Sequence, residues 1–218
     1  MLSVSHELKT PRTAIAGYAE ALREQAVSPK AAAETMVREA DRLQRLIGDL
    51  LDLARMNRTD FSVVTSEIDL GEVADDVARR YQQQAAAFGV SLVAVSEEPA
   101  FALGDADRML QVVSNLVENA LRLTPMGGEV RVVATPGTLR VEDTGPGLQA
   151  EDTKRAFERF YLHSRYGRER KVGTGLGLAI VKELTLAMGG EVEVVSEPGR
   201  LTVFIVRLPV PARVPAWV

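Results

Sequence analysis

Apolar residues in the first part of the chain recur at the spacing of a helical bundle. From Val4, and again from Met36, apolar positions follow one another at alternating intervals of four and three residues. Helices with this heptad pattern pack one side against a neighbouring helix. Ser28 and Pro29 indicate where the second helix starts, because serine caps a first turn and proline fits its first position. We therefore predict a helical hairpin with a short loop near Glu24–Val27 and a seam made of Val4, Leu8, Pro11, Ile15, Tyr18 and Leu22 in the first helix and Met36, Ala40, Leu43, Ile47, Leu50 and Ala54 in the second.

The apolar stripe of the second helix is wider than a two-helix seam requires, because Leu46 and Leu53 lie beside it. A hairpin with such a stripe buries more apolar surface when it pairs with a second copy to form a four-helix bundle. The pattern therefore predicts a homodimer.

A different pattern begins near Glu67, where short β-like runs alternate with helical runs. The segment before it, Asn57–Ser66, is polar and lacks periodicity, which indicates a domain boundary. Consecutive strand-like runs near the C-terminus favour antiparallel pairing in an α+β layer. We predict that residues 1–60 form the helical hairpin, that residues 67–208 form an α+β two-layer sandwich with a mixed, largely antiparallel sheet, and that residues 209–218, with their three prolines, form an irregular tail. The expected helices are Leu70–Phe88, Asp105–Leu123 and Leu176–Met188, and the expected strands are Val90–Val95, Glu129–Thr135, Leu139–Glu142, Glu191–Val195 and Leu201–Leu208.

Composition and charge narrow the class of protein. Of the 218 residues, 46% are hydrophobic and 26% are charged, which excludes a wholly disordered chain. The net charge of −4 gives no support to nucleic-acid binding, and the lack of cysteine excludes disulfides and thiolate zinc sites. No apolar run reaches the ~18 residues of a membrane helix. We therefore expect a cytoplasmic segment without membrane contact; an inner-membrane anchor of the full-length protein would lie upstream of Met1.

The first candidate for chemistry is the run S-H-E-L-K-T-P at residues 5–11. On the predicted heptad, His6 falls opposite the apolar seam, and Thr10 lies one turn further along the same face. Pro11 removes the amide that would bond the Glu7 carbonyl, at a cost of roughly 3 kcal/mol inside a helix. A surface histidine on an amphipathic helix is the alternative interpretation of His6. The nearby Pro11 favours a functional role for His6, because a residue that destabilises the helix is expected to serve a function there.

The second candidate is a polar row on the helix Asp105–Leu123, made of Gln111, Asn115, Asn119 and Arg122. Asparagines on a mostly buried helix are costly unless they are hydrogen-bonded or bind something. A solvated stripe is the alternative interpretation.

Two glycine-containing runs follow. The strand-like run Leu139–Glu142 ends in D-T-G-P-G at residues 143–147, a pattern that is usually a turn. The run G-T-G-L-G at residues 173–177 opens the last helix, where glycines allow close approach and the free amides of a helix N-terminus attract anions. It has neither a Walker A lysine nor a strand directly before it, so it supports neither a P-loop nor a dinucleotide fold.

In combination these runs resemble the motifs of histidine kinases. Residues 5–11 resemble the H box, 115–122 the N box, 143–147 the G1 box, 157–160 the F box and 173–177 the G2 box, in family order. Two positions depart from the family pattern: Arg12 stands where the family has an aliphatic residue, and Leu123 where an aromatic residue often stacks on the base. The resemblance implies a dimerising helical hairpin followed by an ATP-binding domain of the kind shared with gyrase, chaperone and mismatch-repair ATPases.

The resemblance also implies a role for each site residue. His6 accepts the γ-phosphate of ATP, and Glu7 orients its imidazole and takes its proton. Asn119 supplies an oxygen to Mg²⁺, Arg122 touches phosphate, and Asp143 accepts a hydrogen bond from the adenine amino group. The ATP site is completed by Asn115, Gly145, Gly147, Gly173, Thr174, Gly175, Leu176 and Gly177.

Further implications concern partners and moving parts. The phosphate passes to an aspartate on the receiver domain of a response regulator, and Thr10, in the family's E-x-x-T pattern, serves phosphatase activity on that regulator. The segment Asn57–Ser66 is expected to act as a hinge. A lid over the triphosphate is expected from the basic residues Arg165, Arg168, Arg170 and Lys171, with a solvated loop as the alternative.

The two alternative functions are a hydrolytic ATPase and a degenerate kinase. Hydrolytic ATPases of the same superfamily carry a glutamate four residues before the metal-binding asparagine, where it activates water. Asn115 occupies that position and cannot act as a base, which favours a kinase. A degenerate kinase used only as a dimeric interaction module is not supported, because every motif keeps its reactive residue.

Overall fold

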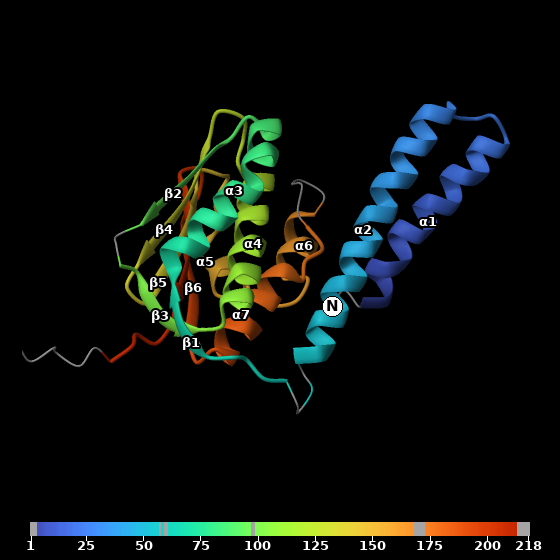
Figure 1. The fold of residues 1–218 in the computed structure, drawn as a ribbon. Helices are drawn as coiled ribbons and strands as arrows, with labels where there is room; N and C mark the ends of the chain where they lie inside the picture. The colour runs from blue at the N-terminus through green and yellow to red at the C-terminus, as the bar shows by residue number, and fades with distance from the viewer. Residues whose placement is uncertain (1–3, 57, 59–60, 97–98, 168–172, 213–218) are drawn as a thin grey trace, which may run out of the picture. The chain divides into compact units, whose positions relative to one another are not determined.

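The computed structural model describes residues 4–56, 58, 61–96, 99–167 and 173–212. The chain divides into two compact units, Met1–Arg55 and Met56–Val218, which are described separately below (Figure 1). No helix of the described residues is both long enough and apolar enough to span a membrane.

The first unit is a helical hairpin of α1 (Val4–Arg23) and α2 (Pro29–Met56). Its second helix starts as predicted, because the Ser28 hydroxyl oxygen accepts a hydrogen bond from the Ala31 amide at 3.3 Å. Pro11 lies inside α1 and is buried.

The buried stripe of α2 differs from the predicted seam. The buried residues are Ala32, Leu46 and Leu53, which are separated by multiples of seven residues. Ile47, which we expected in the seam, keeps 44% of its surface exposed. The difference arises because only one stripe of α2 can face α1 within a single hairpin. The predicted seam therefore remains partly uncovered in the isolated chain.

The second unit is an α+β sandwich. Five strands form one sheet in the order β2-β4-β5-β7-β6, in which β2 and β4 are parallel and the other neighbours are antiparallel. The strands of this sheet are β2 (Ser91–Ser96), β4 (Glu129–Thr135), β5 (Thr138–Asp143), β6 (Glu191–Glu197) and β7 (Leu201–Arg207). The helices are α3 (Leu70–Phe88), α4 (Ala106–Leu123), α5 (Ala150–Thr153), α6 (Tyr161–Tyr166) and α7 (Gly177–Ala187). The hairpin and the mixed, largely antiparallel sheet confirm the predicted fold class.

Four short elements were not expected from the sequence. β1 (Ser66–Asp69) and β3 (Phe101–Gly104) pair as a separate two-stranded antiparallel sheet. The helices α5 and α6 lie between the predicted G1 and G2 boxes, and α6 includes Arg165 of the expected lid.

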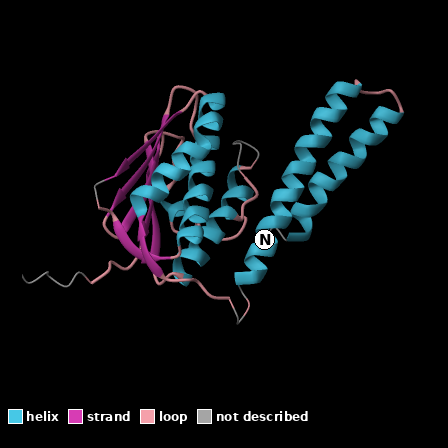
Figure 2. Ribbon diagram, in the orientation of Figure 1, coloured by secondary structure: helices cyan, strands magenta, loops and turns pink. Residues whose placement is uncertain are grey.

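The core lies between one face of the large sheet and the helices α3, α4 and α7 (Figure 2). Burial alternates along β5, where Leu139 and Val141 are fully covered, as expected for a strand with one face on a core. On α4 the covered residues are Met109, Val112, Val113, Leu116, Val117, Ala120 and Leu121. This packing fixes α4 beside the C-terminal end of β5, where the candidate site lies.

Both ends of the second unit are bonded to its body. The Val64 amide donates to the Asp105 carboxylate at 2.9 Å, and the Arg108 guanidinium lies 5.6 Å from the centre of the Phe61 ring. Phe61 and Val64, which lie within the predicted Asn57–Ser66 break, are thus attached to the first turn of α4 and its N-cap. At the other end the Leu103 amide donates to the Pro209 carbonyl at 2.7 Å. Residues 213–218 of the predicted tail lie outside the described residues.

Candidate functional site

A cavity lies at the C-terminal end of β5, between α4, α6 and β7. Its polar lining comes from Asn119, Asp143 and Thr202, and its apolar lining comprises Leu123, Pro146, Gly147, Leu148, Leu162 and Phe204. Clefts with apolar walls and a few polar groups are typical small-molecule sites. The structure thus brings together Asn119, Asp143 and Gly147, three of the residues expected at the ATP site.

Asp143 is the buried acid of this cavity, with 4% of its surface exposed. Its Oδ1 accepts a hydrogen bond from the Gly145 amide at 2.9 Å, and no described residue bonds to its Oδ2. Burial raises the pKa of Asp143 to about 6, although the bond from Gly145 favours the ionised form. A buried carboxylate with one unpaired oxygen is ready to accept a hydrogen bond from a ligand.

Asn119 is half-buried on α4, and its side-chain amide has no hydrogen-bond partner among the described residues. Among all the residues that the structure describes, no group of three or more His, Cys, Asp or Glu side chains could hold a metal ion. A single neutral oxygen fits Mg²⁺, which keeps several waters and shares its remaining ligands with substrate phosphates. It does not fit a metal that needs a cage of protein ligands.

The other polar residues of α4 are engaged within the protein. Asn115 donates from Nδ2 to the Gln111 carbonyl at 3.1 Å, which leaves its Oδ1 near Gly177. Arg122 forms an ion pair with Glu118 at 3.8 Å, and Glu118 accepts a hydrogen bond from the Tyr81 hydroxyl at 2.7 Å. Glu118 therefore links Arg122 to Tyr81 of α3.

The segment Gly173–Gly177 lies against α4 on one side and α6 on the other. A Cβ atom on Gly173 would lie 2.2 Å from the Arg122 guanidinium, so the backbone passes directly beside this cation. Gly175 has a φ of +83°, which favours glycine over residues with a side chain. The Thr174 hydroxyl accepts a hydrogen bond from the Leu176 amide at 3.4 Å, and Leu176 is buried at the start of α7.

The F-box residues anchor this segment. The Phe160 amide donates to the Gly175 carbonyl at 2.8 Å, and the Phe157 ring meets the Phe204 ring edge-on at 6.2 Å. Arg165, expected in a lid, lies on α6 and forms ion pairs with Glu151 and Asp152 at 3.1 and 3.8 Å. Arg168, Arg170 and Lys171 lie outside the described residues.

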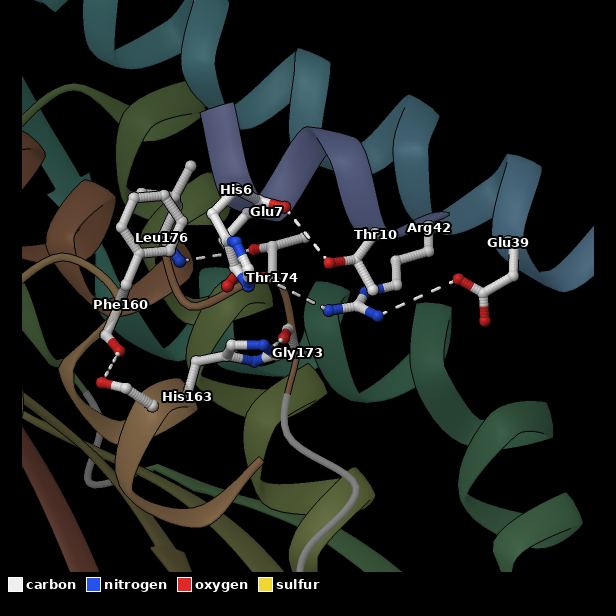
Figure 3. Close-up of polar contacts among 11 residues, drawn as sticks. His6, Glu7, Thr10, Glu39, Arg42, Phe160, His163, Gly173, Thr174 and Leu176 are labelled. Carbon is white, nitrogen blue, oxygen red and sulfur yellow. Dashed lines mark hydrogen bonds and ion pairs between the residues drawn. The ribbon is translucent and has the colours of Figure 1, made fainter. Parts of the chain in front are cut away.

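In the hairpin, His6 is exposed and Thr10 donates from its hydroxyl to the His6 carbonyl at 3.1 Å (Figure 3). Glu7 is paired with Arg42 of α2 at 3.4 Å, and Arg42 also lies 3.9 Å from Glu39. The three expected residues of the H box thus occupy different settings: one exposed ring, one paired acid and one hydroxyl bonded to the backbone.

Several residues of the cavity were not identified from the sequence. Thr202 and Phe204 lie on β7. Together with Val206 they occupy every second position of this strand, and this period of two assigns them to the core face. Leu148 and Leu162 lie in short segments without periodicity, so no sequence pattern points to them.

Comparison with known proteins follows the two units. Residues 2–59 match the His Kinase A phospho-acceptor domain, and residues 104–212 match the family of histidine kinase-, DNA gyrase B- and HSP90-like ATPases. The chain belongs to the sensor histidine kinases. Among the relatives of this kinase core is the sensor protein SrrB of Staphylococcus aureus, which is 35% identical over 217 residues, or 96% of this chain. The chain spans 37% of the length of SrrB.

Solved structures of histidine kinases share the fold of this core. ShkA in complex with AMPPNP is 30% identical with a TM-score of 0.70, and the match covers 97% of this chain and 46% of ShkA. ThkA, solved in complex with the response regulator protein TrrA, is 20% identical with a TM-score of 0.78, and the match covers 95% of this chain and 60% of ThkA.

Proposed function

We propose that this kinase core binds Mg·ATP in the cavity at the end of β5 and transfers the γ-phosphate to His6. The observation that carries the proposal is that one cavity holds two groups with free hydrogen-bonding capacity among the described residues: the buried Asp143, with an unpaired oxygen, and Asn119, with an unpaired side-chain amide. These two groups suit the two ends of a purine nucleotide. The AMPPNP complex of the related ShkA supports ATP as the nucleotide.

Asp143 recognises the base in this proposal. Its unpaired oxygen accepts a hydrogen bond from the adenine amino group, whereas guanine presents an oxygen at the same place and is rejected. Leu123, Leu148 and Leu162 supply apolar contact to the rings. Gly145 and Gly147 let the backbone turn beside the base, and Gly147 does so with a φ of +69°.

The phosphates lie toward Asn119, Arg122 and the segment Gly173–Gly177. Asn119 would hold Mg²⁺ through its side-chain oxygen, and the ion would supply charge neutralisation during phosphoryl transfer. Arg122 adds a fixed positive charge beside Gly173. Asn115 lines the same region as a neutral amide, which supports transfer of the phosphoryl group over hydrolysis because an amide cannot activate water.

In the transfer step an imidazole nitrogen of His6 attacks the γ-phosphorus. The bond from that phosphorus to the β–γ bridging oxygen breaks, and ADP leaves with the electron pair. The imidazole proton passes to Glu7. Because Glu7 pairs with Arg42 in the structure, this role requires the pair to open or to share its acid with His6.

We infer that phosphorylated His6 donates its phosphoryl group to an aspartate of a response regulator, and that the core acts as a homodimer. The complex of ThkA with TrrA supports a regulator partner. The phospho-acceptor family of residues 2–59, together with the exposed Ile47 of the predicted seam, supports the dimer. We further propose that Thr10 supports the removal of phosphate from that response regulator.

Incubation with γ-labelled ATP tests the core of the proposal. We expect label on the chain as a phosphoramidate, lost in acid and stable in base, and none on His6→Gln. Label that persists in His6→Gln or survives acid would exclude His6 as the acceptor. Release of free phosphate without label on the chain would instead indicate a hydrolytic ATPase.

A further inference from the structure

We propose that His163 is a positioning residue for the nucleotide site, an inference that rests on the function proposed above. The Nδ1–H group of His163 holds the Gly173 carbonyl. This contact fixes the conformation of the phosphate-binding segment Gly173–Gly177. His163 belongs to α6, between the F box and the G2 box. Its Nδ1 lies 3.0 Å from the Gly173 carbonyl oxygen (Figure 3).

The chemistry of this contact fixes the protonation of the ring. A carbonyl oxygen can only accept a hydrogen bond, so Nδ1 must carry the hydrogen. A neutral His163 is therefore held as the Nδ1–H tautomer, because the hydrogen bond of one ring nitrogen decides which of the two is protonated. Free neutral histidine favours the other tautomer, which makes this state a measurable signature.

The contact of His163 has a counterpart two residues further along. The Phe160 amide donates to the Gly175 carbonyl at 2.8 Å, so α6 and the residue before it hold the carbonyls on both sides of Thr174. With two carbonyls fixed, the amides between them have a defined direction, which is what an anion site at a helix start requires. The Phe160 contact is made by the backbone, whereas the Gly173 contact depends on one side chain.

α6 is itself a firm support for His163. Buried Asp152 of α5 accepts hydrogen bonds from the Tyr161 hydroxyl at 2.7 Å and from the Tyr166 hydroxyl. These two tyrosines are the first and last residues of α6. A side chain on an element fixed at both ends can hold a loop more accurately than one on a free loop.

Arg122 lies on the opposite side of Gly173, where its guanidinium leaves no room for a Cβ atom. Without the bond from His163, the Gly173 carbonyl can turn, and the backbone can move with respect to this cation. We therefore expect loss of the His163 contact to weaken binding of the triphosphate more than it affects the fold.

Replacement of His163 by asparagine or by glutamine separates positioning from packing. The asparagine nitrogen Nδ2 is as many bonds from the backbone as the histidine Nδ1, whereas the glutamine nitrogen corresponds to Nε2. We expect His163→Asn to bind AMPPNP within about threefold of the parent and His163→Gln to bind roughly tenfold more weakly, which corresponds to ~1.4 kcal/mol. His163→Ala serves as the reference for complete loss. In kinase assays the effect is expected in KM for ATP, with kcat nearly unchanged.

NMR of the ring nitrogens tests the same contact without turnover. The chain contains two histidines, so in His6→Gln the remaining imidazole signal belongs to His163. We expect the neutral ring to show the nitrogen shifts of the Nδ1–H tautomer. The Nε2–H tautomer, or equal loss of affinity in the asparagine and glutamine variants, would overturn the inference while leaving the nucleotide site in place. Failure of the parent protein to bind AMPPNP would instead remove the proposed function itself.

Discussion

Asp143 is an acid whose environment opposes its ionisation. Its ordinary pKa of 3.8 rises to about 6 in the folded chain because burial removes water from the carboxylate. The unfolded chain releases the proton at lower pH than the folded chain does. Ionised Asp143 therefore costs stability, by about 3 kcal/mol at most, and this cost develops as the pH rises from 3.8 through about 6.

Asp143→Asn is accordingly expected to stabilise the nucleotide-free protein and to weaken ATP binding by at least tenfold. The gain in Tm should be largest above pH 6 and should vanish toward pH 4, where the acid is protonated in both states. Thermal melts at several pH values, with calorimetry of AMPPNP binding, measure both effects. A gain in Tm that is constant with pH would show that the acid is not the cause.

Asn119→Asp tests the proposed metal ligand. A charged oxygen in place of a neutral one alters the hydration of Mg²⁺ and repels the nearby phosphates, so affinity for Mg·ATP is expected to fall about tenfold. Calorimetry with AMPPNP, with and without Mg²⁺, separates the two contributions. Unchanged affinity and unchanged magnesium dependence would exclude Asn119 as a ligand.

Thr10→Ala distinguishes a role in chemistry from a role in the helix. The Thr10 hydroxyl donates to the His6 carbonyl, a common habit of helical threonines, but its oxygen can still accept a hydrogen bond. If it holds water in line with an aspartyl phosphate, regulator dephosphorylation falls by an order of magnitude or more while autophosphorylation stays near normal. A parallel fall in both activities would assign Thr10 to helix structure alone.

At the scale of residues, the sequence motifs identified candidate functional side chains but not the residues that contact them. His6 and Asp143 could be predicted because the runs that contain them resemble the H box and the G1 box. The pairing of Glu7 with Arg42 joins residues 35 positions apart, and the contact of His163 with Gly173 depends on the path of a short loop. Neither contact leaves a periodic signal in the sequence.

The elements of this fold could be predicted where they are long and regularly buried. α3 and β4 have the expected bounds, because α3 repeats its apolar residues at helical spacing and β4 is a valine-rich run enclosed by glycines and a proline. β1 and β3 have four residues each, too few for alternation to be recognised. α6 was missed because tertiary contacts hold it: it follows Phe160, whose φ is +61°, and Asp152 bonds both of its ends.

The contact between α5 and α6 offers a test at this scale. Although burial opposes ionisation, hydrogen bonds from Tyr166 and Tyr161 and the charge of Arg165 hold the pKa of Asp152 below its ordinary value. Tyr166→Phe removes one donor from this buried carboxylate and is expected to cost roughly 2 kcal/mol. The loss should be present at neutral pH and should disappear as Asp152 is protonated below its ordinary pKa. Urea melts measure it, and Tyr18→Phe in the hairpin is the control.

At the scale of the whole molecule, the uncovered seam of α2 carries the prediction of a dimer. Replacing Ile47 and Leu50 by glutamate is expected to give monomers, because charges in the centre of a bundle seam oppose association. Nucleotide binding should persist, because the second unit has its own core. Light scattering and calorimetry measure the two properties. Val195→Glu on β6, where 59% of the side chain is exposed, is the matched control. A monomeric parent chain would contradict the prediction.

The anchoring of Phe61 and Val64 to α4 shortens the connection between the two units. With those residues attached, the chain from Met56 to Phe61 reaches at most roughly 17 Å when fully extended. If the proposed nucleotide site and His6 react within one chain, so short a tether would give an effective concentration on the order of millimolar. The same two units, expressed as separate chains at micromolar concentration, should therefore react about a thousandfold more slowly. On this proposal, the length of the linker that the contacts of Phe61 and Val64 leave free sets the local concentration.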